Sequence, residues 1–239
     1  MAGPLYFAIG DIHGEARKLR DLHAAILDRI ARENRAAKIV HLGDYVDRGP
    51  DSRGVIDQVM ALEKKFDRDP VVEVVSLMGN HEEMMLAAYD GPLEDGGTWW
   101  TQGGSETCDS YAAPARATKA WRETIPKAHI DWLRKRPVIL QAPKQHLVFV
   151  HAGIEPASFP NESDHTYMWT RSDRFFKTET WPDRKELKDL LVIHGHTPKT
   201  YEPEVDDRRI NIDTGACFGG PLTAVVLKEG EAPEFLRAT

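Results

Sequence analysis

Three short segments place carboxylate, amide and imidazole side chains in glycine-flanked turns. The first is Gly10-Asp11-Ile12-His13-Gly14, the second runs from Gly43 to Gly49, and the third is Gly79-Asn80-His81-Glu82. Mixed oxygen and imidazole ligands suit Mn, Fe or Zn better than Ca or Mg. The chemistry to expect is therefore that of a transition-metal centre.

The candidate ligands follow successive predicted strands. Asp11 and His13 occupy alternate positions of an extended turn, so both side chains can point toward a first metal. Asp44 ends the second strand and is the candidate for a carboxylate that bridges two metals. The candidates that complete a second metal site are Asn80, His151 and His196.

The elements that must position these ligands repeat in order. An apolar run at residues 5–9 ends at the first turn, and Leu19, Leu22, Ile26 and Ile30 then recur at helical spacing. Residues 38–68 repeat the order of strand, loop and helix, the helix ending before Asp69-Pro70, and 71–77 begin a third unit. Such units predict a mostly parallel sheet, whose ligands gather beyond the carboxyl ends of the strands. All three motifs fall at those ends.

The pattern changes over residues 90–136, which predict a helical insertion without a clear strand. Trp99, Gly103-Gly104 and Tyr111 either wall a substrate groove or pack the insertion onto the domain, and packing is the favoured interpretation. Further on, β-rich runs predict a second sheet packed on the first. These runs are 138–141, 146–150, 190–193, 209–212 and 222–227. The expected fold class is α/β, a two-sheet β-sandwich flanked by helices.

Size and charge narrow the function classes. A chain of 239 residues fits one domain, 1–239. With 38 acidic and 31 basic residues, the net charge is negative, which disfavours binding to nucleic acid or to a membrane surface. Cys108 and Cys217 match no paired spacing and are predicted to be free thiols in a reducing compartment. Without a signal-like N-terminus or a long apolar segment, a cytoplasmic protein is expected.

The motifs resemble those of the metallophosphoesterases. Their exact residue sequences resemble those of the bacterial and phage-like branch of the PPP-type serine/threonine protein phosphatases. The resemblance continues through His151-Ala152-Gly153, Trp169-Thr170-Arg171, Gly195-His196-Thr197 and the segment from Asn211 to Ala216. It implies a calcineurin-like domain with two divalent metals, Mn first, that hydrolyses phosphomonoesters. The implied substrate is a phosphorylated protein (phosphoserine, phosphothreonine or phosphotyrosine) or a small phosphomonoester, with no partner chain.

The substrate's phosphoryl oxygens that do not face the metals also carry negative charge, so cationic side chains are expected on that side. Two metals about 3.5–4 Å apart would clamp a phosphoryl group and generate an attacking hydroxide. Arg48, in its glycine-rich turn, is the first candidate for binding the phosphate oxygens, because a guanidinium offers paired donors. The resemblance gives Arg171 as the second. A solvated surface arginine is the alternative there, because Arg174 and Lys177 lie close by.

A basic leaving group must be protonated as it departs. The resemblance assigns His81 as this general acid, and Asp47 could accept a hydrogen bond from its ring and raise its pKa. Glu82 is predicted to brace the turn. His194 and His41 are predicted to be structural.

Departures from the family pattern leave rival activities open. Met78 stands where protein phosphatases of this family carry an arginine, so one basic wall of the substrate site is missing. A dinucleoside polyphosphate hydrolase, such as one cleaving diadenosine tetraphosphate, is the nearest rival, and Asp47 is taken to argue against it. Pro198 stands where cyclic or nucleic-acid phosphodiesterases carry a second histidine. A catalytically silent binding module would show a broken ligand set, and no predicted ligand is missing.

Overall fold

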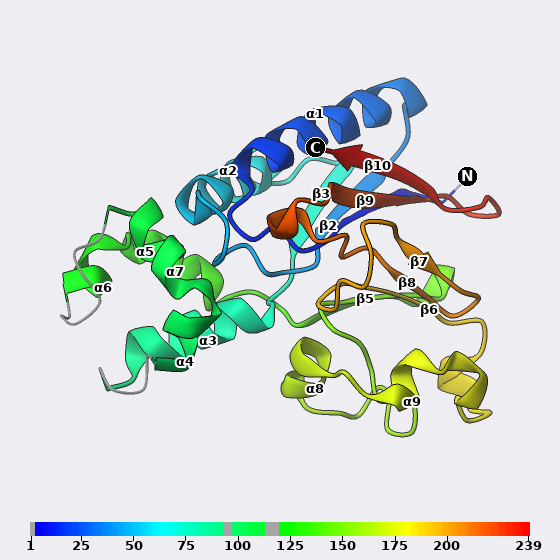
Figure 1. Cartoon of the computed structure of the whole chain (residues 1–239). Helices are drawn as coiled ribbons and strands as arrows, with labels where there is room; N and C mark the ends of the chain where they lie inside the picture. Colours follow the sequence, from blue (N-terminus) through cyan, green and yellow to red (C-terminus); the bar gives the residue numbers. More distant parts are fainter. Residues whose placement is uncertain (1–2, 93–96, 113–119) are drawn as a thin grey trace.

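The computed structural model describes residues 3–92, 97–112 and 120–239. Two five-stranded sheets pack against each other, and helices cover the outer face of each (Figure 1). The first sheet has the order β10-β9-β1-β2-β3 and the second β4-β5-β6-β8-β7. The α/β fold class predicted from the sequence is thereby confirmed.

The first sheet combines a parallel half with an antiparallel half. Its strands are β1 (Leu5–Ile9), β2 (Ala37–His41), β3 (Val72–Ser76), β9 (Leu222–Leu227) and β10 (Glu234–Ala238). Strands β1, β2 and β3 run parallel because α1 (Ala16–Glu33) and α2 (Ser52–Lys65) return the chain between them. Strands β9 and β10 continue the sheet in antiparallel pairing beyond β1.

The second sheet is built from shorter strands. These are β4 (Ile139–Ala142), β5 (Leu147–Val150), β6 (Leu191–His194), β7 (Glu204–Val205) and β8 (Arg209–Asn211). Strands β5, β6 and β8 are parallel, and β4 and β7 add antiparallel edges. Helices α8 (Asp164–Trp169) and α9 (Asp173–Phe176) belong to its outer layer (Figure 1). Short 3-10 turns occupy Pro143–Gln145, Thr178–Thr180, Lys185–Leu187 and Ala216–Phe218.

One strand lies in a different sheet from the one predicted. The β-rich run 222–227 is predicted to belong to the second sheet, but β9 pairs with β1 in the first, with Ile9 opposite Ala224. After β8 the chain crosses between the sheets through Asp213 and Thr214. All six residues of β9 are buried, as befits a strand in the interior of a sheet. The assignment was wrong because an apolar run does not identify its partner strand.

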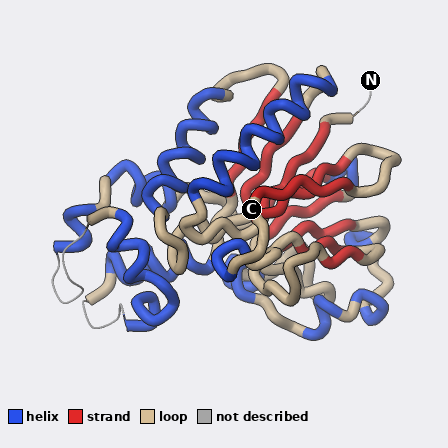
Figure 2. Tube along the Cα trace, turned by 45° about the horizontal axis from the view of Figure 1, so that its top comes forward, coloured by secondary structure: helices blue, strands red, loops and turns tan. Residues whose placement is uncertain are grey.

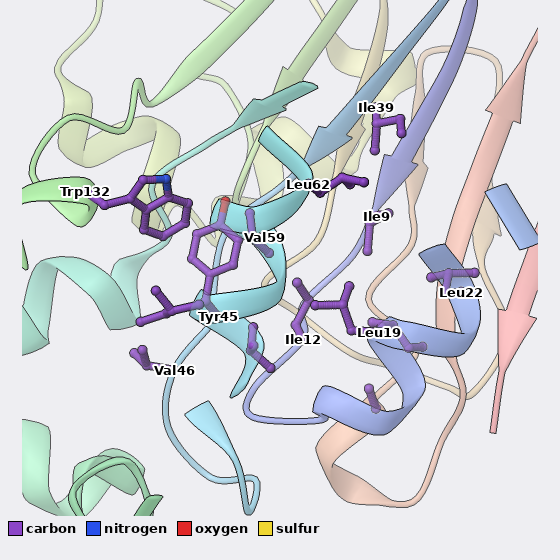
Figure 3. Packing of buried hydrophobic residues seen from close by; sticks show 14 of the residues in the cluster. Ile9, Ile12, Leu19, Leu22, Ile39, Tyr45, Val46, Val59, Leu62 and Trp132 are labelled. Atoms are coloured by element: carbon purple, nitrogen blue, oxygen red, sulfur yellow. The ribbon is translucent and has the colours of Figure 1, made fainter. Parts of the chain in front are cut away.

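The side chains of β1 point alternately to the two faces of the first sheet and so contribute to two separate hydrophobic cores. Tyr6 and Ala8 face the second sheet, where they pack with Phe149 and Ile193. Leu5, Phe7 and Ile9 face α1 and α2 and belong to the larger core. Figure 3 shows part of that core, with Ile9 and Ile39 from the sheet near Leu19 and Leu22 of α1 and Val59 and Leu62 of α2. A third cluster, around Phe175 and Trp181, covers the outer face of the second sheet.

The insertion is helical where the structure describes it. It follows α3 (Asn80–Asp90), which begins at the third motif. Its elements are α4 (Gly97–Trp99), a π-helical turn (Trp100–Gly104), α5 (Ser105–Ser110), α6 (Ala120–Thr124) and α7 (Lys127–Leu133). They project to one side of the sheets (Figure 1), and Figure 2 shows loops gathered between them and the strands. Within the predicted span, residues 93–96 and 113–119 lie outside the described part. Among the described helices, none is both long and apolar enough to cross a membrane.

Candidate metal centre

The three glycine-flanked motifs lie where β1, β2 and β3 end. Gly79 must lack a side chain, because a Cβ there would lie 2.3 Å from Asp44 Oδ1. Five site residues adopt left-handed backbone conformations that non-glycine residues seldom use. They are His13 (φ 44°), Asp44 (φ 52°), Asp47 (φ 75°), Arg48 (φ 67°) and His196 (φ 71°). These five are half of the ten non-glycine residues with positive φ in the described part of the chain, so the site contains a marked share of the strained backbone.

The first cluster of potential ligands consists of His13, Asp44 and His81. His13 donates from Nδ1 to the Val46 carbonyl at 2.8 Å, which leaves the lone pair on Nε2. That Nε2 lies 3.3 Å from Asp44 Oδ2. The backbone carbonyl thus orients His13 so that its free nitrogen points at the shared carboxylate.

The second cluster contains Asp44, His151 and His196, all buried. His151 Nδ1 donates to the Leu42 carbonyl at 3.1 Å, and its Nε2 lies 3.4 Å from Asp44 Oδ2. The side-chain oxygen of Asn80 lies 2.9 Å from both His151 Nε2 and His196 Nδ1. Because Asp44 belongs to both clusters, it occupies the bridging position that the sequence predicts.

The donor set fits divalent cations. Burial lowers the pKa of His13 to about 3 and that of His196 to about 2, so both rings are neutral and have lone pairs to offer. Burial opposes a charge on His151, but the carboxylates of Asp44 and Asp11 raise its pKa to about 9. A positive charge is therefore favoured where these groups converge, and a divalent ion would supply it.

Asp11 lies beside the second cluster. Its two oxygens accept hydrogen bonds from the His196 backbone N–H at 3.1 and 3.0 Å. Burial and the neighbouring Asp213 hold the pKa of Asp11 well above its usual value. Asp213 was not a predicted site residue, although it stands in one of the motifs that carry the resemblance. Asp11 was predicted to serve the first metal together with His13, but it takes part in neither cluster and contacts the His196 backbone beside the second.

Glu82 braces the turn that carries Asp44. Its Oε1 accepts from the backbone N–H groups of Tyr45 at 2.7 Å and Val46 at 3.2 Å. Its Oε2 accepts from those of Asp44 at 2.8 Å and Gly79 at 2.9 Å. One fully buried carboxylate therefore satisfies four backbone donors and joins the second motif to the third, which is the structural role predicted for it.

His81 and Asp47 form the hydrogen-bonded pair expected from the sequence. The Nδ1 of His81 lies 2.6 Å from Asp47 Oδ2. Two residues of the insertion also donate to this carboxylate, Trp99 from Nε1 and Thr107 from its hydroxyl at 2.8 Å. Burial raises the pKa of Asp47, and the bonds from His81 and Thr107 oppose that shift. Trp99 thus packs within the insertion, as favoured, and also holds Asp47.

Both candidate arginines reach the centre. Arg48 donates from Nη1 to His13 Nε2 at 2.7 Å, beside the first cluster. Arg171 donates from Nε to His196 Nε2 at 3.1 Å, beside the second. Arg174 instead lies near Glu155 on the surface. The two guanidinium groups therefore flank the shared Asp44 from opposite clusters.

The other buried histidines have partners away from the clusters. His194 accepts from Arg209 at 3.3 Å and packs against Phe175. His41 lies 2.9 Å from His23, ring nitrogen to ring nitrogen. Both placements agree with the structural roles predicted for His194 and His41. Cys108 and Cys217 form no disulfide.

Comparison with known proteins identifies the family to which the chain belongs. The model of the calcineurin-like phosphoesterases matches residues 6–227. The chain belongs to this family. Members are dimetal-dependent hydrolases, and the two clusters that share Asp44 fit such a pair of metals.

The relatives carry more specific names. An asymmetrical bis(5'-nucleosyl)-tetraphosphatase PrpE of Geobacillus thermodenitrificans is 30% identical over 91% of this chain and 88% of its own. A symmetrical bis(5'-nucleosyl)-tetraphosphatase of Erwinia tasmaniensis is 32% identical, covering 93% and 71%. A cold-active protein-tyrosine phosphatase of a Shewanella species shares the fold, with a TM-score of 0.59 over 98% of this chain and 80% of its own at 16% identity. The two sequence relatives are thus both named as dinucleoside tetraphosphatases, whereas the structural neighbour, at 16% identity, shows the fold alone.

Proposed function

We propose that this chain hydrolyses dinucleoside polyphosphates, such as diadenosine tetraphosphate, at a centre of two divalent metals, and that residues 1–239 act as one catalytic domain. One observation carries the proposal: relatives similar over about nine-tenths of this chain are named bis(5'-nucleosyl)-tetraphosphatases. Arg48 and Arg171 lie beside different ligand clusters, at His13 and His196, and their guanidinium groups can bind the phosphate oxygens of such a substrate.

The proposed metal ligands are those predicted from the sequence. Asp44 would bridge the metals, His13 and Asp11 would serve the first, and Asn80, His151 and His196 the second. Mn is the first candidate for this mixed nitrogen and oxygen set, with Fe and Zn as alternatives. When bound, the two metals supply Lewis acidity and lower the pKa of water.

The protein residues bind the substrate and control a proton. Arg48 and Arg171 donate hydrogen bonds to phosphate oxygens and offset their charge. His81 is held through Nδ1 by Asp47, so its Nε2 can give a proton to the departing oxygen. Water adds to one phosphorus, the bridging P–O bond breaks, and two nucleotides leave.

Asp47, which the sequence pattern set against this substrate, does not exclude it. A nucleotide leaving from an anhydride is a weaker base than an alkoxide and needs less protonation. The Asp47–His81 pair is therefore less necessary for an anhydride, but it is compatible with one. Asp47 discriminates poorly between the two substrate classes for this reason.

A phosphomonoester hydrolase, including a phosphoserine, phosphothreonine or phosphotyrosine phosphatase, is the second candidate. The observation in its favour is the 2.6 Å contact between His81 and Asp47. A general acid held this firmly suits a basic leaving group such as the serine or threonine alkoxide.

Product analysis separates the candidates. The protein, supplemented with Mn²⁺, is incubated with diadenosine tetraphosphate or a phosphoserine peptide, and the products are resolved by anion exchange. The proposal predicts a higher kcat/KM for the dinucleotide, with ATP plus AMP indicating asymmetrical and two ADP symmetrical cleavage. Phosphate release from the peptide without nucleotide formation would overturn it in favour of the second candidate.

A further inference from the structure

Large apolar side chains are rarely exposed on this protein, and two of them lie together. Among the described residues, the exposed large hydrophobics are Val71, Tyr201, Val205 and Phe218. Tyr201 and Phe218 are each 55% exposed, and the Tyr201 hydroxyl donates to the Phe218 carbonyl at 2.8 Å. Two exposed aromatic residues joined by this hydrogen bond form a candidate binding surface, because scattered single apolar residues are the usual pattern.

The loop that carries Phe218 is held in place. Phe218 and Gly220 both donate from their backbone N–H groups to the Gly215 carbonyl, at 2.9 and 3.0 Å. Lys18 donates from Nζ to the carbonyls of Ala216 at 2.8 Å and Gly220 at 2.9 Å. The Tyr201 ring lies so close that a Cβ on Gly220 would be 2.7 Å from its Cδ1. Phe218 is thus presented from a preorganised turn, so that little ordering would be needed when a ligand binds.

Arg48 connects this ring to the metal centre. Its guanidinium carbon lies 5.5 Å from the centre of the Phe218 ring. The same guanidinium donates to His13 Nε2 at 2.7 Å. The Arg48 side chain therefore contacts both a candidate metal ligand, His13, and the exposed ring of Phe218. A ligand that fits must combine a phosphate for Arg48 with a flat ring for Phe218.

We propose that Phe218 is the stacking platform for the nucleobase of a nucleotide whose phosphate is bound at Arg48, and that Tyr201 positions it. This inference rests on the proposed function and assigns the specificity-determining residue. Stacking on an aromatic ring tolerates any base, because every base has a π-face. The site therefore selects nucleotides over other phosphates but discriminates weakly among adenine, guanine and pyrimidines.

The test compares two ligands that differ by the base. Equilibrium dialysis of the Mn²⁺-supplemented protein measures Kd for AMP and for ribose 5-phosphate. The original chain is expected to bind AMP roughly five- to a hundredfold more tightly, the range that base stacking provides. Phe218→Ala should bring the two Kd values within about twofold of each other, and Phe218→Trp should keep the preference. Because the ratio is taken within one protein, an altered metal content or turnover does not enter it.

Val205→Ala is the control, since Val205 is 52% exposed and lies in β7, at the edge of the second sheet. It should keep the AMP preference. Equal affinities in the original chain, or a preference that survives Phe218→Ala, would overturn the inference. Its failure is distinguishable from that of the proposed function. Cleavage of diadenosine tetraphosphate without an AMP preference rejects the platform alone, whereas an AMP preference without cleavage rejects the hydrolase assignment alone.

Discussion

The indole Nε1 of Trp99 donates to both carboxylate oxygens of Asp47, each at 3.0 Å. Asp47 in turn holds His81. A residue of the helical insertion is therefore hydrogen-bonded to the partner of the proposed general acid. The insertion contributes to the positioning of His81 as well as to packing.

Trp99→Phe should weaken this positioning while keeping an aromatic ring in the cluster with Trp121. Loss of one hydrogen bond to a buried carboxylate is expected to reduce turnover of phenyl phosphate about three- to tenfold. Turnover of p-nitrophenyl phosphate should change less, because nitrophenolate needs little protonation. Steady-state kinetics with both substrates measure the difference. Trp100→Phe is the control, since its ring packs on Trp99 at 4.9 Å but does not bind Asp47. A uniform loss on both substrates would indicate a purely structural role for Trp99.

Asp44 should matter more for metal binding than Asp11. Asp44 takes part in both ligand clusters, whereas Asp11 accepts the His196 N–H beside one of them. Asp44→Asn is therefore expected to lower the content of both metals and to reduce activity at least tenfold more than Asp11→Asn. Elemental analysis after dialysis, with activity measured before and after chelation and Mn²⁺ addition, checks both points. Similar small losses would mean that Asp44 does not bridge, and full activity after verified metal removal would refute a metal-dependent reaction.

Arg171 should bind phosphate through its place beside His196. Arg171→Ala is expected to raise KM and to lower kcat/KM roughly 10–100-fold, the cost of removing a charged hydrogen bond. Arg48→Ala should act similarly at the other cluster. Arg174→Ala, which removes a neighbouring surface charge, is the control and should leave both constants unchanged. Unaltered kinetics in Arg171→Ala would leave Arg48 as the sole phosphate-binding arginine.

The buried His23–His41 pair should make the fold sensitive to acid. Burial lowers the pKa of His23 from 6.5 to about 4, and burial together with the neighbouring His23 lowers the pKa of His41 well below its usual value. The unfolded chain therefore binds more protons than the folded protein between about pH 6.5 and 4, so stability falls as the pH decreases through this window. His23 alone corresponds to about 3 kcal/mol.

Thermal unfolding between pH 7.5 and pH 4.5 measures this effect. His23→Gln keeps a hydrogen-bonding group next to His41 but does not titrate here, so its Tm should fall less steeply with decreasing pH. The exposed His165, changed to Gln, serves as the control and should leave the slope as it is. Parallel curves for all three proteins would show that the pair does not govern acid stability.

Local patterns predicted the parallel half of the first sheet and the ligand-bearing turns. The apolar residues of α1 recur at helical spacing, and each strand before a motif is a short apolar run. Glycine marks the turns for a physical reason, since Gly43 has φ 107° and its Cβ would lie 2.5 Å from Gly79 N. The candidate metal ligands come together because β1, β2 and β3 are parallel, and the carboxyl ends of parallel strands lie at the same edge of a sheet.

Long-range partners could not be predicted in the same way. Trp99 and Thr107 bind Asp47 across 52 and 60 residues of sequence, and no spacing rule links an insertion to a turn. Strand β7 has only two residues, and only one of the five residues of β10 is buried, so neither leaves a strong apolar pattern. Substrate class was harder still, since the Asp47–His81 pair serves monoesters and anhydrides alike.

The role of His81 can be separated from metal binding by the leaving group. If His81 protonates the departing oxygen, His81→Asn should reduce turnover in proportion to the basicity of that group, by about 10²–10⁴-fold where protonation is required. A phosphoserine peptide or phenyl phosphate should therefore be affected far more than p-nitrophenyl phosphate. Asp47→Asn should show the same selective defect at smaller size, because it disturbs the orientation of His81 without removing it.

Metal content decides between the two roles that the structure allows His81. Its ring lies close enough to His13 and Asp44 to be counted with them as a potential ligand, and its Nδ1 also contacts Asp47. If His81 is the general acid, the His81→Asn variant should retain both metals by elemental analysis and show the selective defect. If His81 is a metal ligand, the variant should lose metal and turn over all substrates more slowly, by equal factors. Equal losses of activity on all substrates, accompanied by loss of metal, would mean that His81 is a third ligand of the first cluster and not the general acid. The proton would then have to come from another group.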